Sequence, residues 1–138
     1  MSVPHVYAFE GIDESLGLVP LAARRALDVA RVKLSLEAWT SSPRETRFTI
    51  TALGGAPVVD AAAVRTAVAD ASTRPLSSDA PADPSPDAVP SELARLVTEA
   101  AWRALAPVDR YALWKVSRGK HPEDILPRAC AEILSRQS

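Results

Sequence analysis

The sequence has few of the residues that build metal and disulfide sites. Among its 138 residues there are one cysteine, Cys130, and two histidines, His5 and His121. A single cysteine rules out an internal disulfide, and neither Cys-x-x-Cys nor His-x-x-x-His spacing occurs, which argues against structural zinc. We therefore expect no metal site, with both histidines at the surface and Cys130 in the core.

Long apolar runs and an excess of positive charge are also missing. No stretch approaches the roughly 18 apolar residues that a membrane-spanning helix needs. The net charge is −1, whereas nucleic-acid binding usually needs a basic face. The first five residues lack the basic start and apolar run of a signal peptide. We expect a cytoplasmic protein that contacts neither nucleic acid nor membrane.

Groupings typical of catalysis are lacking as well. Cys130 has no base beside it in the sequence, and a thiol in apolar surroundings is inert. The adjacent acidic pairs, Asp13-Glu14 and Glu123-Asp124, would not face each other on a helix. Gly54-Gly55 lacks the pattern of a phosphate-binding loop. The expectation is a protein that is not an enzyme and holds no cofactor of its own.

What the sequence does contain predicts short helices. Apolar residues make up 47% of the chain, and 12 prolines imply many short elements. The expected helices begin near Pro20 and Pro43 and span about 61–72, 90–105, 107–117 and 123–136. We expect Pro127 in the first turn of the last helix, and residues 3–10 to be extended.

Local signals add detail to the first half. Alanines at 22, 23, 26 and 30 would let a neighbouring helix approach the first helix closely. Ser42-Pro43-Arg44-Glu45 has the serine, proline and glutamate of a capping box, so we expect a helix behind it despite its β-branched residues. Gly54-Gly55 should end that helix. Ser35 should cap a short turn that contains Trp39.

Residues 74–89 have the composition of a linker. They contain prolines, aspartates and serines, and no aromatic residue. Such a stretch buries too little apolar surface to offset the entropy of ordering it, so we expect it to be mobile. We predict one all-α domain of five or six short helices, with a first half (1–73), this linker (74–89) and a second half (90–138).

The two halves share an internal repeat. Aromatic, arginine and aliphatic residues recur at one constant separation along the chain, which we call the repeat offset. The pairs are Trp39 and Trp102, Arg47 and Arg110, Phe48 and Tyr111, and Ile50 and Leu113. A proline, Pro43 or Pro107, lies between the tryptophan and the arginine of each half. The pattern predicts two related αα-hairpins, each turning an aromatic residue of its second helix towards its first.

Two blocks of residues carry a resemblance to a known family. The first runs from Phe9-Glu10 through Val19-Pro20 and Val32-Lys33-Leu34 to Trp39. The second runs from Leu105-Ala106-Pro107 through Arg110-Tyr111 and Lys115-Val116-Ser117-Arg118 to His121. With these blocks, residues 7–53 and 101–134 resemble the nitrate reductase associated protein of bacteria that assimilate nitrate.

The resemblance implies an accessory role in making or sustaining active assimilatory nitrate reductase, which would be the protein partner. The molybdenum cofactor and the iron–sulfur cluster would belong to that enzyme. The chain departs from the family at Leu18, Arg31 and Gly54-Gly55, where a cysteine, a glycine and a Pro-Cys pair are usual. The resemblance therefore implies no cysteine-based metal or redox role here.

Basic residues gather in the second half, where the resemblance is densest. Cations at a helix end complement the helix dipole, so a solvated helix end is one interpretation. The other is a docking patch for an acidic partner or an anionic cofactor, with a tryptophan as hot spot. The predicted partner-binding residues are Arg110, Trp114, Lys115, Arg118 and His121. The alternative function is a small-molecule or cofactor carrier that holds an anionic pterin or a nitrate-related ligand.

Overall fold

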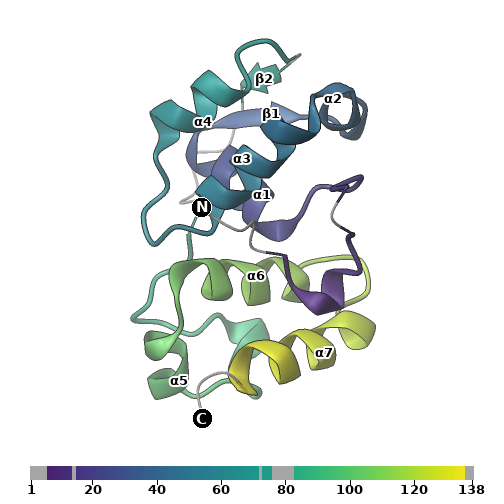
Figure 1. Ribbon diagram of the computed structural model, residues 1–138. Helices are drawn as coiled ribbons and strands as arrows, with labels where there is room; N and C mark the ends of the chain where they lie inside the picture. Colours follow the sequence, from purple (N-terminus) through teal and green to yellow (C-terminus); the bar gives the residue numbers. More distant parts are fainter. Residues whose placement is uncertain (1–5, 14, 72, 76–82, 136–138) are drawn as a thin grey trace. The chain divides into compact units, whose positions relative to one another are not determined.

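A computed structural model describes residues 6–13, 15–71, 73–75 and 83–135 (Figure 1). These residues form seven α-helices, two short 3-10 helices and one two-stranded sheet. The predicted all-α class therefore fits most of the fold but omits the small sheet. The chain divides into two compact units, unit 1 (residues 1–82) and unit 2 (residues 83–138), and their boundary falls inside the predicted linker.

Unit 1 is built on a pair of packed helices. Its elements are η1 (Ala8–Glu10), α1 (Leu21–Val29), β1 (Val32–Leu34), α2 (Leu36–Ser41), α3 (Arg44–Gly54), α4 (Ala61–Ala67) and β2 (Thr73–Pro75). α1 packs along α3, and α4 packs against both of these helices (Figure 1). β1 and β2 pair antiparallel, with Lys33 opposite Arg74. This pairing joins segments that lie far apart in the sequence.

The alanines of α1 explain how closely α1 and α3 approach each other. Ala22, Ala23 and Ala26 are fully buried, as predicted for a face that admits a neighbouring helix. Gly54, the last residue of α3, lies against the backbone of Ala22, so a Cβ atom at this position would overlap the Ala22 carbonyl oxygen. Only glycine can occupy this crossing point without displacing one of the helices.

Arg25 is buried inside unit 1 and satisfies the end of α3. Its side chain is 1% exposed. Its Nη1 donates to the carbonyl oxygens of Gly54 at 2.8 Å and Ala56 at 2.5 Å, and its Nη2 donates to that of Pro57 at 3.1 Å. The last carbonyls of a helix have no partner within the helix and attract cations. A side chain of α1 thus caps α3.

Unit 2 is arranged around α6. Its elements are η2 (Ser91–Leu93), α5 (Glu99–Ala104), α6 (Pro107–Ser117) and α7 (Pro122–Ser135). Both η2 and α7 pack against α6. The buried apolar residues of the unit are Leu93, Val97, Trp102, Leu105, Val108, Tyr111, Ala112, Leu113, Val116, Leu126, Ala129 and Ile133. The predicted helix 107–117 is confirmed at both ends.

The predicted helix 90–105 is wrong, because an α-helix begins only after Thr98. Thr98 has φ −74° and ψ 159°, and its side-chain oxygen accepts a hydrogen bond from the Ala101 amide. The threonine therefore begins a new helix, α5, and only η2 forms in the segment before it. Propensity favoured a continuous helix, but a side chain that caps a helix also marks where it begins.

Three smaller predictions also need correction. Of residues 3–10, the described part includes the 3-10 turn η1 and is not extended throughout. The helix predicted over 61–72 ends at Ala67. Pro127 lies in the second turn of α7, since the helix begins at Pro122.

The capping box predicted at Ser42 does not form, although the helix behind it does. Pro43 keeps an extended backbone, with ψ 148°, and precedes the first helical residue. The Ser42 hydroxyl instead donates to the Ala38 carbonyl at 2.9 Å. Ser35 does cap α2 through its side chain, as predicted, and the Asp60 carboxylate caps α4 in the same way.

Both ends of the predicted linker belong to folded units. Arg74 and Pro75 lie in β2. The Ser85 carbonyl accepts a hydrogen bond from the Trp102 indole at 2.7 Å, and Asp87 lies 3.9 Å from the Arg103 guanidinium. The prediction that the whole segment is mobile fails for these residues, while residues 76–82 lie outside the described part.

The repeat in the sequence is matched by a repeat of elements. α5 and α6 have the same lengths as α2 and α3 and follow them at the repeat offset. Thr98 caps α5 as Ser35 caps α2. Trp39 and Trp102 are both fully buried, and each indole donates to a backbone carbonyl at 2.7 Å. The hairpin packing within each helix pair stays a prediction.

No helix in the described residues has both the length and the apolar character needed to span a membrane.

Candidate functional site

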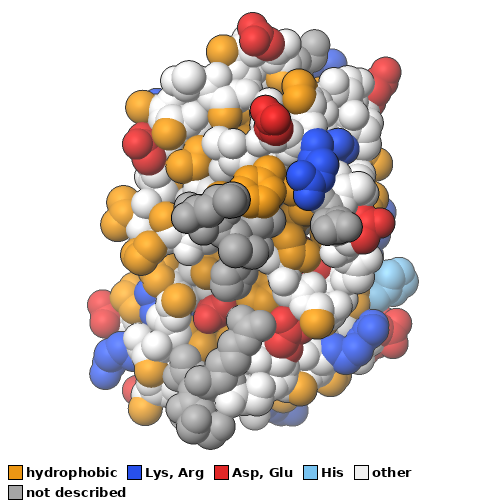
Figure 2. Space-filling view, viewed as in Figure 1, with side chains coloured by type: hydrophobic (Ala, Val, Ile, Leu, Met, Phe, Trp, Pro, Cys, Tyr) orange, Lys and Arg blue, Asp and Glu red, His pale blue; other side chains and the backbone are white. Residues whose placement is uncertain are grey.

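Charged side chains of both signs are interspersed over the face shown in Figure 2. A candidate site must therefore be sought in local groupings of side chains. One such grouping lies at the end of α6 and in the turn that leads to α7. It consists of Trp114, Lys115 and Arg118, three of the five predicted partner-binding residues, and we call it the Trp114 patch.

The centre of the Trp114 patch is a tryptophan flanked by two cations. The Trp114 side chain is half-buried and meets Tyr111 edge to face, with ring centroids 6.3 Å apart. The Lys115 ammonium lies 5.2 Å from the Trp114 ring centroid, and the Arg118 guanidinium lies 5.4 Å from it. Cations at this distance are attracted by the negative face of an aromatic ring. The ring holds both charges next to an apolar surface.

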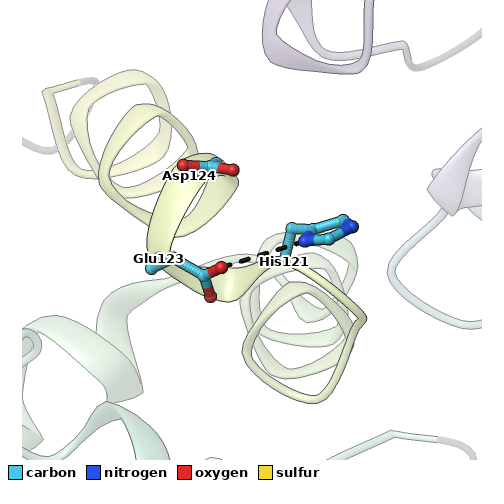
Figure 3. Close-up of side chains that lie close together, drawn as sticks. All are labelled: His121, Glu123 and Asp124. Carbon is cyan, nitrogen blue, oxygen red and sulfur yellow. Dashed lines mark ion pairs between the residues drawn. The ribbon is translucent and has the colours of Figure 1, made fainter.

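His121, another predicted partner-binding residue, lies in the turn before α7 and forms an ion pair of its own. Its Nδ1 lies 3.8 Å from a carboxylate oxygen of Glu123, and both side chains are mostly exposed (Figure 3). Asp124 follows in the first turn of α7. The side-chain atoms of the three residues that could coordinate a metal ion lie within 4.8 Å of one another. Carboxylates in a first helical turn favour the positive end of the helix dipole, which accounts for the acidic pair.

Arg110 was predicted to touch the partner, but the structure gives it a different position. It is 8% exposed. Its Nη1 donates to the carbonyl oxygens of Trp102, Arg103 and Leu105 at the end of α5. A guanidinium held this way joins α5 to α6, and its burial argues against direct contact with another protein.

The Trp114 patch has no counterpart in unit 1. At the repeat offset, Lys115 corresponds to Ala52, Arg118 to Gly55 and His121 to Val58. Trp114 corresponds to Thr51, which is fully buried. The repeated helices therefore occur in both halves, but only unit 2 carries cations at these positions.

A cavity of about 500 Å³ lies in unit 1 and was missed by the sequence analysis. Its lining combines small, hydroxyl and carboxylate side chains: Ser35, Glu37, Ala38, Ser41, Ser42, Pro43, Thr46, Ala67, Asp70 and Ala71. Glu37 and Asp70 are the charged members of this lining, and both are negative. Its chemistry therefore disfavours an anion. No motif could have signalled it, because its residues come from α2, the link to α3, the start of α3, and the end of α4 with the residues that follow it.

Cys130 lies on α7 and is half-buried, not fully buried as predicted for a core residue. Burial raises the pKa of its thiol above the usual 9.0. The thiolate is the nucleophilic and metal-binding form of cysteine. The position of Cys130 therefore lowers its reactivity near neutral pH.

A comparison with known families gives one match. The model of a family described as conserved nitrate reductase-associated protein matches residues 6–133. No curated protein and no solved structure matches the chain. The match covers nearly all of both units, including the whole Trp114 patch.

Proposed function

The chain belongs to the conserved nitrate reductase-associated protein family, and from this we propose that it is a non-catalytic accessory protein that acts by binding nitrate reductase. We propose further that it works in the cytoplasm, as a maturation or assembly factor for the assimilatory enzyme. The observation that carries the proposal is the Trp114 patch, a surface grouping of one tryptophan and two cations in a chain of this family.

The Trp114 patch has the chemistry of a protein-binding hot spot. Tryptophan and arginine are enriched among the residues that contribute most to protein–protein affinity. The contacts of Lys115 and Arg118 with the indole favour one arrangement of two long side chains before a partner arrives. Less entropy is then lost on binding. The partner surface should be acidic, because the exposed Arg118 guanidinium would otherwise face a like charge.

Reversing one charge of the patch tests the proposal. Tagged wild-type protein should capture nitrate reductase from nitrate-grown cells, and Arg118→Glu should lower the captured amount at least about tenfold, since it both removes a cation and introduces repulsion. The captured enzyme is measured by its nitrate-reducing activity and by mass spectrometry. Arg95→Glu is the matched control, because Arg95 is also exposed in unit 2 but lies outside the patch.

The outcomes separate clearly. Failure of the wild-type protein to capture nitrate reductase would refute the accessory role. Capture that survives Arg118→Glu would refute the Trp114 patch as the docking surface. An equal loss of captured nitrate reductase with Arg95→Glu would show that the effect comes from the change in charge and does not depend on its position.

The alternative, a carrier of an anionic pterin or a nitrate-related ligand, has less support. The unit 1 cavity contains Glu37 and Asp70, and both would repel an anion. A carrier should gain thermal stability when its ligand is present, because binding to the folded state alone favours folding. We expect nitrate, molybdate and a pterin to leave the melting temperature unchanged, and a rise with any of them would revive the carrier function.

A further inference from the structure

The repeat allows unit 1 to be used as a template for unit 2. In unit 1, the C-terminal half of α3 is covered by the first turns of α1. Thr51 is fully buried there, and Gly54 lies against the backbone of Ala22. Arg25 enters from α1 and donates to carbonyls at the end of α3. The first turn of α1 thus fills the surface of α3 around Gly54.

Unit 2 lacks most of the corresponding helix. The Trp102 indole donates to Ser85 where the Trp39 indole donates to Leu16, so residues 86–97 take the place that residues 17–34 have in unit 1. Only η2 forms among them, and it packs against α6. The described residues of unit 2 thus include no α-helix that corresponds to α1.

The burial of α6 agrees with this difference. Arg110 to Leu113, in the middle of the helix, and Val116 near its end are buried. Trp114 and Ser117, the counterparts of Thr51 and Gly54, are only half-buried. Ser117 is small, and its hydroxyl already donates to the Trp114 carbonyl at 2.6 Å. The C-terminal half of α6 therefore has a small residue where α3 admits a close helix.

The charges of the two units are distributed in opposite ways. In unit 1, the cation at the end of α3 comes from the covering helix, as Arg25, while α3 and its end carry the neutral residues Ala52 and Gly55. In unit 2, α6 and its end carry cations at the corresponding positions, Lys115 and Arg118. A helix that covered α6 would meet these cations, so its complementary charge is negative.

We propose that the C-terminal half of α6, along Trp114, Ser117 and Arg118, receives a short acidic helix of the partner protein. The helix would be about two to three turns long, as α1 is, with small residues on its contact face and carboxylates facing Arg118. This inference rests on the proposed function, since it takes the partner to be nitrate reductase. The partner helix would then pack on α6 as α1 packs on α3.

A steric block at the small residue tests the proposed geometry. In capture assays with purified nitrate reductase, Ser117→Trp should lower binding at least tenfold, while Ser117→Ala should stay within twofold of wild type. Ala131→Trp, on the exposed face of α7, adds the same bulk outside the site and should bind like wild type. Undiminished capture by Ser117→Trp would overturn the inference but leave the accessory role standing, whereas absence of wild-type capture would refute both.

A photo-crosslinker identifies what binds and does not depend on how well Ser117→Trp folds. Benzoylphenylalanine replaces Lys120, an exposed residue just beyond α6, in the full-length chain. After irradiation of the complex, mass spectrometry should find the crosslink in a helical segment of nitrate reductase that is rich in aspartate, glutamate and small residues. A crosslink confined to a loop, a strand or a basic segment would overturn the inference.

Discussion

Two arginines in this protein are used as internal caps. Arg25 and Arg110 are both buried, and each donates to several backbone carbonyls at the end of another helix. The planar guanidinium has five donors, so it can satisfy several carbonyls that a helix end leaves without partners. Charged residues that look like surface residues in the sequence therefore hold the helices of each unit together.

Replacing Arg25 tests this role. Arg25→Leu should lower the free energy of unfolding by about 3 kcal/mol, because it leaves buried carbonyls at the end of α3 without donors. Denaturation in urea, followed by circular dichroism, measures the change. Arg24→Leu is the control, since Arg24 is exposed on the same helix and should change stability by less than about 0.5 kcal/mol. Similar losses in both variants would contradict the capping role.

The thiol of Cys130 gives a second prediction. Burial raises its pKa, so at any pH below the raised value the folded protein has a smaller thiolate fraction than the unfolded chain. Alkylation by iodoacetamide at pH 8 should therefore be slower in the folded protein than in urea, and should accelerate as the pH rises. Equal rates in both conditions would show that the thiol is fully accessible. Cys130→Ala should leave nitrate reductase capture unchanged.

The elements of the protein are placed by short-range signals and joined by close packing. Ser35 and Thr98 accept hydrogen bonds from the Ala38 and Ala101 amides at 3.0 and 3.1 Å, so the same local cap begins α2 and α5. The way α1 crosses α3 depends instead on the absence of a side chain at Gly54. Caps set where helices begin, while small residues set how closely the helices approach.

The crossing of α1 and α3 leads to a sharp prediction. Gly54→Ala should destabilise unit 1 by about 3 kcal/mol, because the new Cβ would overlap the Ala22 carbonyl, which is rigid backbone. Gly17→Ala is the matched control, because a Cβ there would lie 3.8 Å from the Ser15 hydroxyl, an ordinary contact. Thermal unfolding should show a much lower melting temperature for the first variant only. A wild-type melting temperature for Gly54→Ala would contradict the packing.

On the scale of the whole molecule, charge is nearly balanced. The net charge is −1, and both signs are interspersed on the face in Figure 2. Long-range attraction of a partner by the total charge is therefore weak. Any electrostatic contribution to docking must come from a local grouping, for which the Trp114 patch provides Lys115 and Arg118.

Salt dependence tests this local contribution. The association rate with nitrate reductase should fall roughly threefold to tenfold between 0.05 and 0.5 M sodium chloride, because salt screens exposed charges beyond a few ångströms. Surface plasmon resonance measures the rate. Arg118→Glu should flatten or invert the dependence, while Arg95→Glu should keep it. A rate independent of salt for the wild-type protein would contradict docking through these cations.

The sequence by itself determined where several helices begin, because the signals are local. Proline and capping side chains act on the backbone within a few residues, so α1, α2, α4 and α6 begin within a residue of the predicted positions. The internal repeat that relates Trp39 to Trp102 was also visible in the sequence, and so was the family.

Only the tertiary structure decided which side chains meet. Strand β1 pairs with β2, a segment far away along the chain. On α1, Arg25 is buried while its neighbour Arg24 is exposed, and nothing in the sequence distinguishes the two. The sequence placed Arg110 among the docking residues, but the end of α5 takes up its guanidinium. A side chain's partner depends on how the helices pack, and this packing is set by contacts between distant parts of each unit, which no local pattern encodes.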